Sequence, residues 1–177
     1  MSARAFVAVG SNVDPEHNVA DALERLGRRQ RIVAVSNFYR TPALGAPGSP
    51  DFLNGVVEIE TWLEPLALKR EILLQIEGEL GRERGTDRDA PRTIDLDLVL
   101  YGDLVSSEKG LVLPAPELLE RAFVALPLLE LEPDLRLPGT DRPLRELAAG
   151  LSSSEMAPAE LFNARRRRVE RSGKESA

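Results

Sequence analysis

Two aspartates in one short and otherwise apolar segment give the strongest chemical signal in the chain. Asp95 and Asp97 lie between Ile94 and Tyr101, a run typical of a β-strand. Side chains alternate along a strand, so both carboxylates are expected on one face with Val99 and Tyr101, roughly 7 Å apart. The opposite face would carry Ile94, Leu96, Leu98 and Leu100. Two like charges on a covered face need cations or donors to offset them, and such oxygen ligands suit Mg²⁺.

Four arginines precede the two aspartates at short intervals: Arg82, Arg84, Arg88 and Arg92. Guanidinium groups bind phosphate oxygens, so an arginine run that leads into a carboxylate pair favours a site for a metal-bound polyphosphate. Each signal also has a plainer interpretation. The aspartates could form the solvent face of an amphipathic strand, and the arginines could pair on the surface with acids such as Glu79, at little gain in stability.

Composition limits the other classes of function. The chain has 177 residues, 42% hydrophobic and 29% charged, which is enough for one domain with a real core. It has no cysteine and one histidine, His17, which excludes thiolate and multi-histidine metal sites. A net charge of −6 disfavours a general nucleic-acid binder. No apolar run is long enough to span a membrane and no signal peptide is visible, so we expect a cytoplasmic protein without membrane contact.

Hydrophobic periodicity predicts alternating strands and helices that position these residues. Their order, β, α, β, β, α, β, is that of the ferredoxin-like α+β sandwich, in which two helices pack on an antiparallel sheet. The expected strands are 5–9, 31–38, 52–62 and the aspartate segment, and the expected helices begin at Pro15 and Pro65 and end at Gly27 and Gly81.

The remainder is expected to add smaller elements to this domain, which we assign to residues 1–150. A hairpin is predicted between 104–105 and 111–113, followed by short helices within 117–131 and one amphipathic turn at 144–147. Residues 151–177 are interpreted as a basic tail, mobile or partly helical, in which 159–162 could dock as one turn. No chemistry is assigned to the tail.

Several short motifs occur together in an order that resembles a known family, the 6-hydroxymethyl-7,8-dihydropterin pyrophosphokinases (HPPK). The resemblance covers roughly residues 4 to 148, and the run from Pro91 to Asp97 is its most specific part. The other motifs are Gly10-Ser11-Asn12, Phe38 to Pro42 with Leu44-Gly45, Asp51 to Asn54, Ile76-Glu77, Leu80 to Arg84, and Arg121 with Phe123.

This resemblance implies transfer of the terminal pyrophosphoryl group of ATP to the hydroxymethyl oxygen of the pterin, as a step of folate biosynthesis. It implies two Mg²⁺ ions held by Asp95 and Asp97, while Arg82 and Arg92 complete the catalytic set and steady the triphosphate. The nucleotide-binding residues implied are Glu77, Arg84, Arg88, Leu98, Lys109 and Arg121.

For the pterin, the resemblance implies a flat slot between the rings of Phe52 and Phe123. Asn54 would bond the amide and amine edge of the ring in both directions. Backbone groups of Thr41 and Leu44 would complete that edge, and Pro42 would stiffen their loop.

The chain departs from the family pattern on the nucleotide side. Asp89-Ala90 replaces the usual Trp-Gly, and Ala115 stands where a histidine is typical. The alternatives left open are a catalytically weak paralogue that binds pterin and a pterin kinase with altered nucleotide preference. A ferredoxin-like RNA-binding module is disfavoured by its missing aromatics and by the charge. The expected partners are ATP and the pterin, with a monomer as the expected state and a dimer as the alternative.

Overall fold

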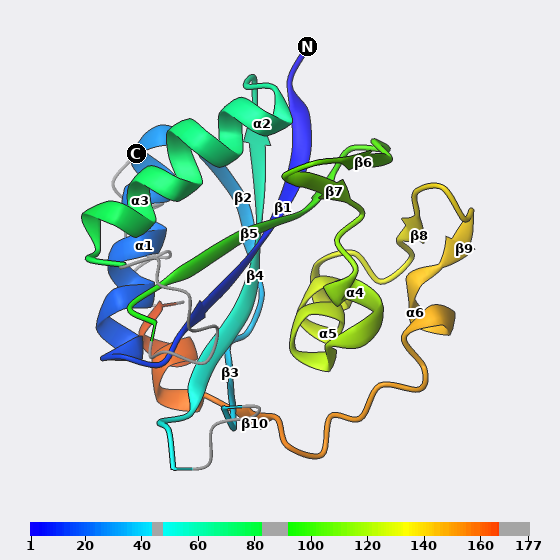
Figure 1. Ribbon diagram of the computed structural model, residues 1–177. Helices are drawn as coiled ribbons and strands as arrows, with labels where there is room; N and C mark the ends of the chain where they lie inside the picture. The colour runs from blue at the N-terminus through cyan, green and yellow to red at the C-terminus, as the bar shows by residue number, and fades with distance from the viewer. Residues whose placement is uncertain (44–47, 83–91, 167–177) are drawn as a thin grey trace.

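The computed structural model describes residues 1–43, 48–82 and 92–166. Within these ranges the chain forms the predicted ferredoxin-like βαββαβ core, in which the second predicted strand is divided in two (Figure 1). The core elements are β1 (Ala3–Ser11), α1 (Pro15–Arg29), β2 (Arg31–Val35), β3 (Tyr39–Thr41), β4 (Phe52–Thr61), α2 (Pro65–Ala67), the π-helical segment η1 (Leu68–Leu73), α3 (Leu74–Glu79) and β5 (Asp95–Tyr101).

All strand pairs of the main sheet are antiparallel. The order is β10-β3-β4-β1-β5, where β10 (Ala157–Pro158) comes from the end of the chain, and β2 pairs with the far half of β4. The central strand β1 pairs with β4 from Ala3 to Ser11 and with β5 from Ala5 to Gly10. Its last residues therefore lie between the aspartate end of β5 and the start of β4.

Helices cover both faces of the sheet. On one face α1 and the continuous α2–η1–α3 helix enclose a core that includes Val7, Val9 and Leu96. On the other face α4 (Glu117–Glu120), α5 (Ala122–Leu131) and α6 (Leu144–Leu147) pack over Phe6 and Val56 (Figure 1). Two small hairpins lie beside these helices: β6 (Ser106–Glu108) with β7 (Leu111–Leu113), and β8 (Arg136–Leu137) with β9 (Arg142–Pro143).

Local sequence explains where the helices begin and end. Pro15 and Glu16 occupy the first turn of α1, which buries Val19, Ala22 and Leu26 at helical spacing. The prediction that Gly27 ends this helix is wrong, because α1 continues to Arg29. Gly81, with a φ of 75°, does follow the end of α3 as predicted. No helix in the described ranges is both long and apolar enough to span a membrane.

A β-bulge changes the side-chain alternation of β5. Phe6 pairs with Leu100, whereas the next residue, Val7, pairs with Leu98, so that β5 carries one extra residue there. Leu100 consequently lies in the core under α4–α6, together with Val99, and Tyr101 packs against the opposite core. The predicted faces of Leu100 and Tyr101 are therefore wrong, whereas Asp95 and Asp97 precede the bulge and share one face.

Two strand boundaries also differ from the prediction. The strand expected over 31–38 is divided into β2 and β3, which pair with different halves of β4. Ser36 lies in the break, where its N–H and hydroxyl bond the backbone of Val56. The first hairpin strand begins at Ser106 and not at Leu104, since its register places Ser106 opposite Leu113.

The segment predicted as a tail contributes to the sheet and to the core. Of the alternatives left open, the structure shows docking for residues 157–166. β10 pairs with β3, residues 160–166 are helical, and Ala159 and Phe162 are buried in the helix-side core. The remaining tail residues, 167–177, lie outside the described part of the chain.

Gly55 is required by the close approach of a buried ring. A Cβ atom at this position would lie 2.8 Å from Cε1 of Phe38, a side chain that is fully buried. We expect Gly55→Ala to lower the free energy of unfolding by about 1–3 kcal/mol, because the core must shift to admit the methyl group. Denaturant-induced unfolding measures this change.

Gly78→Ala provides the matched control. Gly78 lies on the exposed side of α3, where a Cβ meets no atom within 4 Å. The same substitution there should raise the free energy of unfolding by about 0.5–1 kcal/mol through helix propensity. Equal effects at both glycines would contradict the proposed packing at Gly55.

Candidate active site

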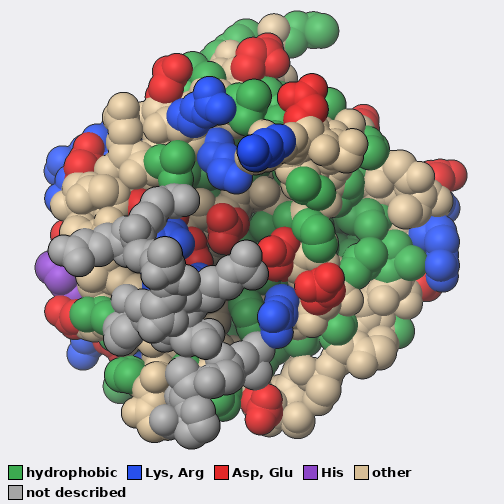
Figure 2. All heavy atoms as spheres, viewed as in Figure 1, with side chains coloured by type: hydrophobic (Ala, Val, Ile, Leu, Met, Phe, Trp, Pro, Cys, Tyr) green, Lys and Arg blue, Asp and Glu red, His purple; other side chains and the backbone are tan. Residues whose placement is uncertain are grey.

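A cavity of about 440 Å³ opens on the face of the sheet that α4 and α5 cover. Acidic side chains gather near the centre of this face, with basic side chains on either side (Figure 2). The cavity brings together nine residues singled out from the sequence: Thr41, Pro42, Phe52, Asn54, Arg92, Asp95, Asp97, Arg121 and Phe123. Glu117, which the sequence did not single out, also lines it.

The cavity floor is formed by facing residues of three strands. Asp95 pairs with Gly10 of β1, and Gly10 pairs with Asn54 of β4. One step along, Asp97 pairs with Ala8. Small residues on β1 thus separate the carboxylates from the amide. A Cβ on Gly10 would lie 2.7 Å from Oδ1 of Asn54, so glycine is needed for the amide to lie across the floor.

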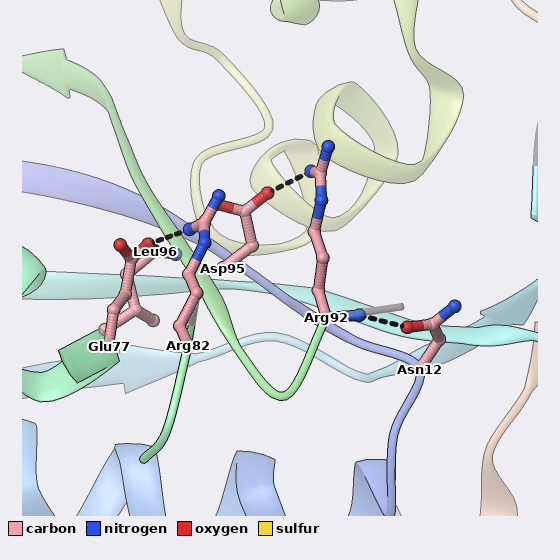
Figure 3. A network of polar contacts seen from close by, with 6 residues as sticks. All are labelled: Asn12, Glu77, Arg82, Arg92, Asp95 and Leu96. Carbon is pink, nitrogen blue, oxygen red and sulfur yellow. Dashed lines mark hydrogen bonds and ion pairs between the residues drawn. The ribbon is translucent and has the colours of Figure 1, made fainter. Parts of the chain in front are cut away.

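Asp95 lies between two guanidinium groups (Figure 3). Its Oδ1 accepts from Nη1 of Arg82, and its Oδ2 accepts from Nη1 of Arg92 at 2.5 Å. Arg82 also pairs with Glu77, whose side chain is almost fully buried and whose Oε1 accepts the Leu96 N–H at 2.8 Å. Burial alone would lower the pKa of Arg82, but Asp95 and Glu77 outweigh it, so this pKa is raised and the guanidinium stays charged.

Asp97 is in a different electrostatic environment. Among the described residues it takes part in no ion pair. Water reaches its carboxylate through the cavity, but protein encloses it on most sides. This desolvation, followed by repulsion from Asp95 and then Glu77, raises the pKa of Asp97 to about 6. A carboxylate whose ionised form is disfavoured in this way is stabilised when a cation binds next to it.

The residues at the end of β1 position this network. Oδ1 of Asn12 accepts the Arg92 N–H at 2.7 Å, and the Asn12 N–H donates to the Arg92 carbonyl at 3.1 Å (Figure 3). The Ser11 hydroxyl donates to the Thr93 carbonyl at 2.6 Å. Ser11 and Asn12 are both buried. Sequence reasoning included them in a motif but gave them no site role; the available signal was a pair of polar residues directly after a buried strand.

The other end of the cavity combines aromatic and amide groups. Phe52 and Phe123 both line it, from β4 and α5. Nδ2 of Asn54 donates to Oγ1 of Thr41 at 2.8 Å, which joins β4 to the end of β3. This end is suited to a flat, polar-edged ring.

Some predicted site residues do not reach the cavity. Glu77 lies behind Arg82, Leu98 is 6% exposed within the helix-side core, and Lys109 is exposed at the β6–β7 turn. Ala115 is buried, and its N–H donates to the Val99 carbonyl at 2.9 Å. Leu44, Arg84, Arg88, Asp89 and Ala90 lie outside the described residues.

The fold and the cavity define a class before any comparison is made. This is a ferredoxin-like α+β protein whose cavity holds a carboxylate pair and arginines at one end and aromatic rings at the other, a composition suited to phosphoryl transfer.

Comparisons with known proteins narrow the class to one family. A family model described as 7,8-dihydro-6-hydroxymethylpterin-pyrophosphokinase (HPPK) matches residues 6–133. The chain is 43% identical over 152 residues to a 2-amino-4-hydroxy-6-hydroxymethyldihydropteridine pyrophosphokinase of Pseudomonas aeruginosa, covering 84% of this chain and 92% of that protein. It is 42% identical over 154 residues to a protein of the same description from Methylorubrum extorquens, covering 85% and 95%. The chain therefore belongs to the HPPK family.

A solved structure supports the fold independently. It is described as an HPPK-DHPS in complex with substrates, and it superimposes with a TM-score of 0.67 at 13% sequence identity. The match covers 87% of this chain and 44% of that one. The ferredoxin-like fold predicted from the sequence is thereby confirmed.

The raised pKa of Asp97 predicts a stability effect with a defined pH dependence. Because the folded protein disfavours the ionised carboxylate, Asp97 lowers stability above pH 6, and this penalty disappears as the pH falls toward 4. Asp97→Asn should therefore raise the free energy of unfolding at pH 8 by about 1 kcal/mol, a modest value because water reaches the group.

Unfolding measured in a chelating buffer at pH 8 and pH 4 tests this effect. The difference between the Asn variant and the parent should shrink at the lower pH. An Asn variant that is less stable than the parent at pH 8 would contradict the electrostatic environment described for Asp97.

Proposed function

We propose that the chain transfers the pyrophosphoryl group of ATP to 6-hydroxymethyl-7,8-dihydropterin, giving AMP and the pterin diphosphate for folate biosynthesis. The single observation that carries this proposal is the two-ended cavity. It has the Asp95–Asp97 pair and Arg92 at one end, and Asn54 with two phenylalanine rings at the other. Family membership and relatives described as pyrophosphokinases of this pterin support the same reaction.

In this reaction the hydroxymethyl oxygen attacks the β-phosphorus of ATP and forms a new P–O bond. The bond from the β-phosphorus to the α–β bridging oxygen breaks, that oxygen leaves with AMP, and the hydroxyl proton passes to water. The protein's contribution is placement and electrostatic stabilisation, since the reacting groups belong to the substrates.

Asp95 and Asp97 fit Mg²⁺. Both are hard oxygen donors on one face, and Asp97 has no cationic partner among the residues described. Those residues hold no cluster of three or more potential metal-ligating side chains, so phosphate oxygens and water would complete the coordination. Two bound ions would neutralise charge on the phosphate oxygens during transfer.

Arg82 and Arg92 are proposed to steady the triphosphate. In the ligand-free structure Asp95 holds both guanidinium groups at the cavity, with Glu77 supporting Arg82 from behind. As metal-bound phosphate enters, the arginines can exchange the carboxylate for phosphate oxygens without a large movement. Glu77 then acts by positioning Arg82 and not by touching the nucleotide.

The remaining nucleotide contacts are proposed with different degrees of structural support. Arg121 lines the cavity. Leu98 can contribute only backbone groups, since its side chain is in the core. Arg84, Arg88 and Lys109 are proposed on the family resemblance alone.

At the pterin end, the ring is proposed to lie between Phe52 and Phe123, with its polar edge toward Asn54, Thr41 and the backbone of Leu44. Pro42 lines the same end of the cavity. A flat heterocycle gains stacking area there, and the Asn54 amide can both donate and accept along its edge. We further propose that the enzyme works in the cytoplasm, as a monomer.

Turnover tests the proposal directly. We expect AMP to form only when ATP, Mg²⁺ and the pterin alcohol are all present. Asp97→Asn should reduce the rate by at least about a hundredfold, because a lost charged ligand removes stabilisation of the developing phosphate charge. Asp103→Asn, the same change at an exposed turn residue, is the matched control and should leave the rate unaltered.

The outcomes separate the alternatives. Pterin binding without AMP formation would replace the enzyme by a pterin-binding paralogue. Full activity in Asp97→Asn would reject the metal assignment while leaving the reaction in place.

A further inference from the structure

The segment 151–166 lies outside the part of the chain that the family model matches, yet it runs along the pterin end of the cavity. In Figure 1 it passes from α6 beneath α5 to β10 at the end of the sheet. There Ala157 pairs with Arg40 and Pro158 with Tyr39, so the segment adds a strand directly beside β3. The next residue of β3, Thr41, lines the cavity.

Asn163 binds the backbone of Phe38 in both directions. Its Oδ1 accepts the Phe38 N–H at 2.8 Å, and its Nδ2 donates to the Phe38 carbonyl at 3.0 Å. The Ala159 N–H donates to the same carbonyl at 3.0 Å. Asn163 is 2% exposed, so solvent cannot replace these bonds if the side chain is removed. The ring of Phe162 meets that of Phe38 edge-on, with centroids 5.4 Å apart.

Phe38 transmits this fixation to the cavity through two routes. Its ring lies against Gly55, which lines the cavity and follows Asn54 in β4. Its backbone leads into β3, where Tyr39 pairs with Asn54 and Thr41 with Phe52. The hydrogen bond from Asn54 to Thr41 joins the two routes at the cavity. The residues proposed to hold the pterin are thus placed by a strand that the C-terminal segment secures.

The first part of the segment supports the opposite wall. Leu151, Ser152, Glu155 and Met156 line a second cavity of about 150 Å³. Its other walls are Thr41, Pro42, Arg121 and Phe123, all of which also line the main cavity. The C-terminal segment therefore stands behind both sides of the slot.

From these contacts we propose that residues 151–166 are a structural part of the pterin site, with Asn163 as a positioning residue for pterin binding. This inference rests on the proposed function of the cavity. Asn163 touches no substrate; it fixes Phe38, and through Phe38 the spacing between Thr41 and Asn54. The arginine and carboxylate end of the cavity depends instead on Ser11 and Asn12, so the effect is confined to the pterin.

Steady-state kinetics of Asn163→Ala in the full-length chain test the proposal. The KM for the pterin should rise about tenfold, while the KM for ATP stays within about twofold, because only the pterin end loses its fixed spacing. Leu161→Ala is the matched control. It removes a larger side chain from the same helix, but Leu161 is 74% exposed and should leave both constants unchanged.

A purely structural role predicts a different pattern. It would lower the fraction of active enzyme, and hence apparent kcat, without changing either KM, and this result would overturn the proposal. Equal increases in both KM values would overturn it as well. If thermal denaturation shows that Asn163→Ala is unfolded at the assay temperature, Phe162→Leu takes its place. That variant should raise the pterin KM about threefold, and an unchanged value would reject the inference.

A binding measurement separates this inference from the proposed function. If the parent chain forms no AMP, the proposed reaction fails, and the dissociation constant of 6-hydroxymethylpterin, followed by its fluorescence, becomes the readout. Weaker binding by Asn163→Ala than by the parent supports the positioning role. Equal binding, or no binding by the parent, overturns it.

Discussion

The balance of charge around Asp95 is the constraint on which the site depends. Glu77 and Asp95 offset the guanidinium groups of Arg82 and Arg92, and all four side chains are partly or wholly withdrawn from water. Asp97 is the carboxylate left over, and its raised pKa records the cost. Desolvated charges persist only when partners of opposite sign are close. The arrangement thus provides two arginines for phosphate and one carboxylate that gains most from a metal ion.

The fold maintains this balance through contacts that are distant in sequence. Ser11 and Asn12, at the end of β1, hold the backbone of Arg92 and Thr93 just before β5 begins. Gly10 and Ala8 keep the cavity floor low between the aspartates and Asn54. The central strand therefore has two tasks, since it pairs both neighbours in the sheet and supplies the small residues that create the cavity.

The sequence predicts the placement of the aspartates well, because alternation along a strand is a local property. It fails beyond Leu98, because the bulge arises from pairing with Phe6 and Val7, which periodicity within β5 cannot reveal. The family resemblance brought together most of the cavity residues, but the role of Asn12 required the position of Arg92. Docking of the C-terminal segment was equally hidden, since a basic composition suggests a tail and Asn163 finds its partner 125 residues earlier in the chain.

The most direct test is to follow ATP consumption with the pterin alcohol and Mg²⁺ by phosphorus NMR, which identifies the products and not only their rate of formation. The account predicts equal amounts of AMP and a diphosphate ester with two coupled phosphorus resonances. Formation of ADP with a single phosphomonoester resonance would contradict it, because the arginines and carboxylates of this cavity would then direct attack to the γ-phosphorus and not to the β-phosphorus.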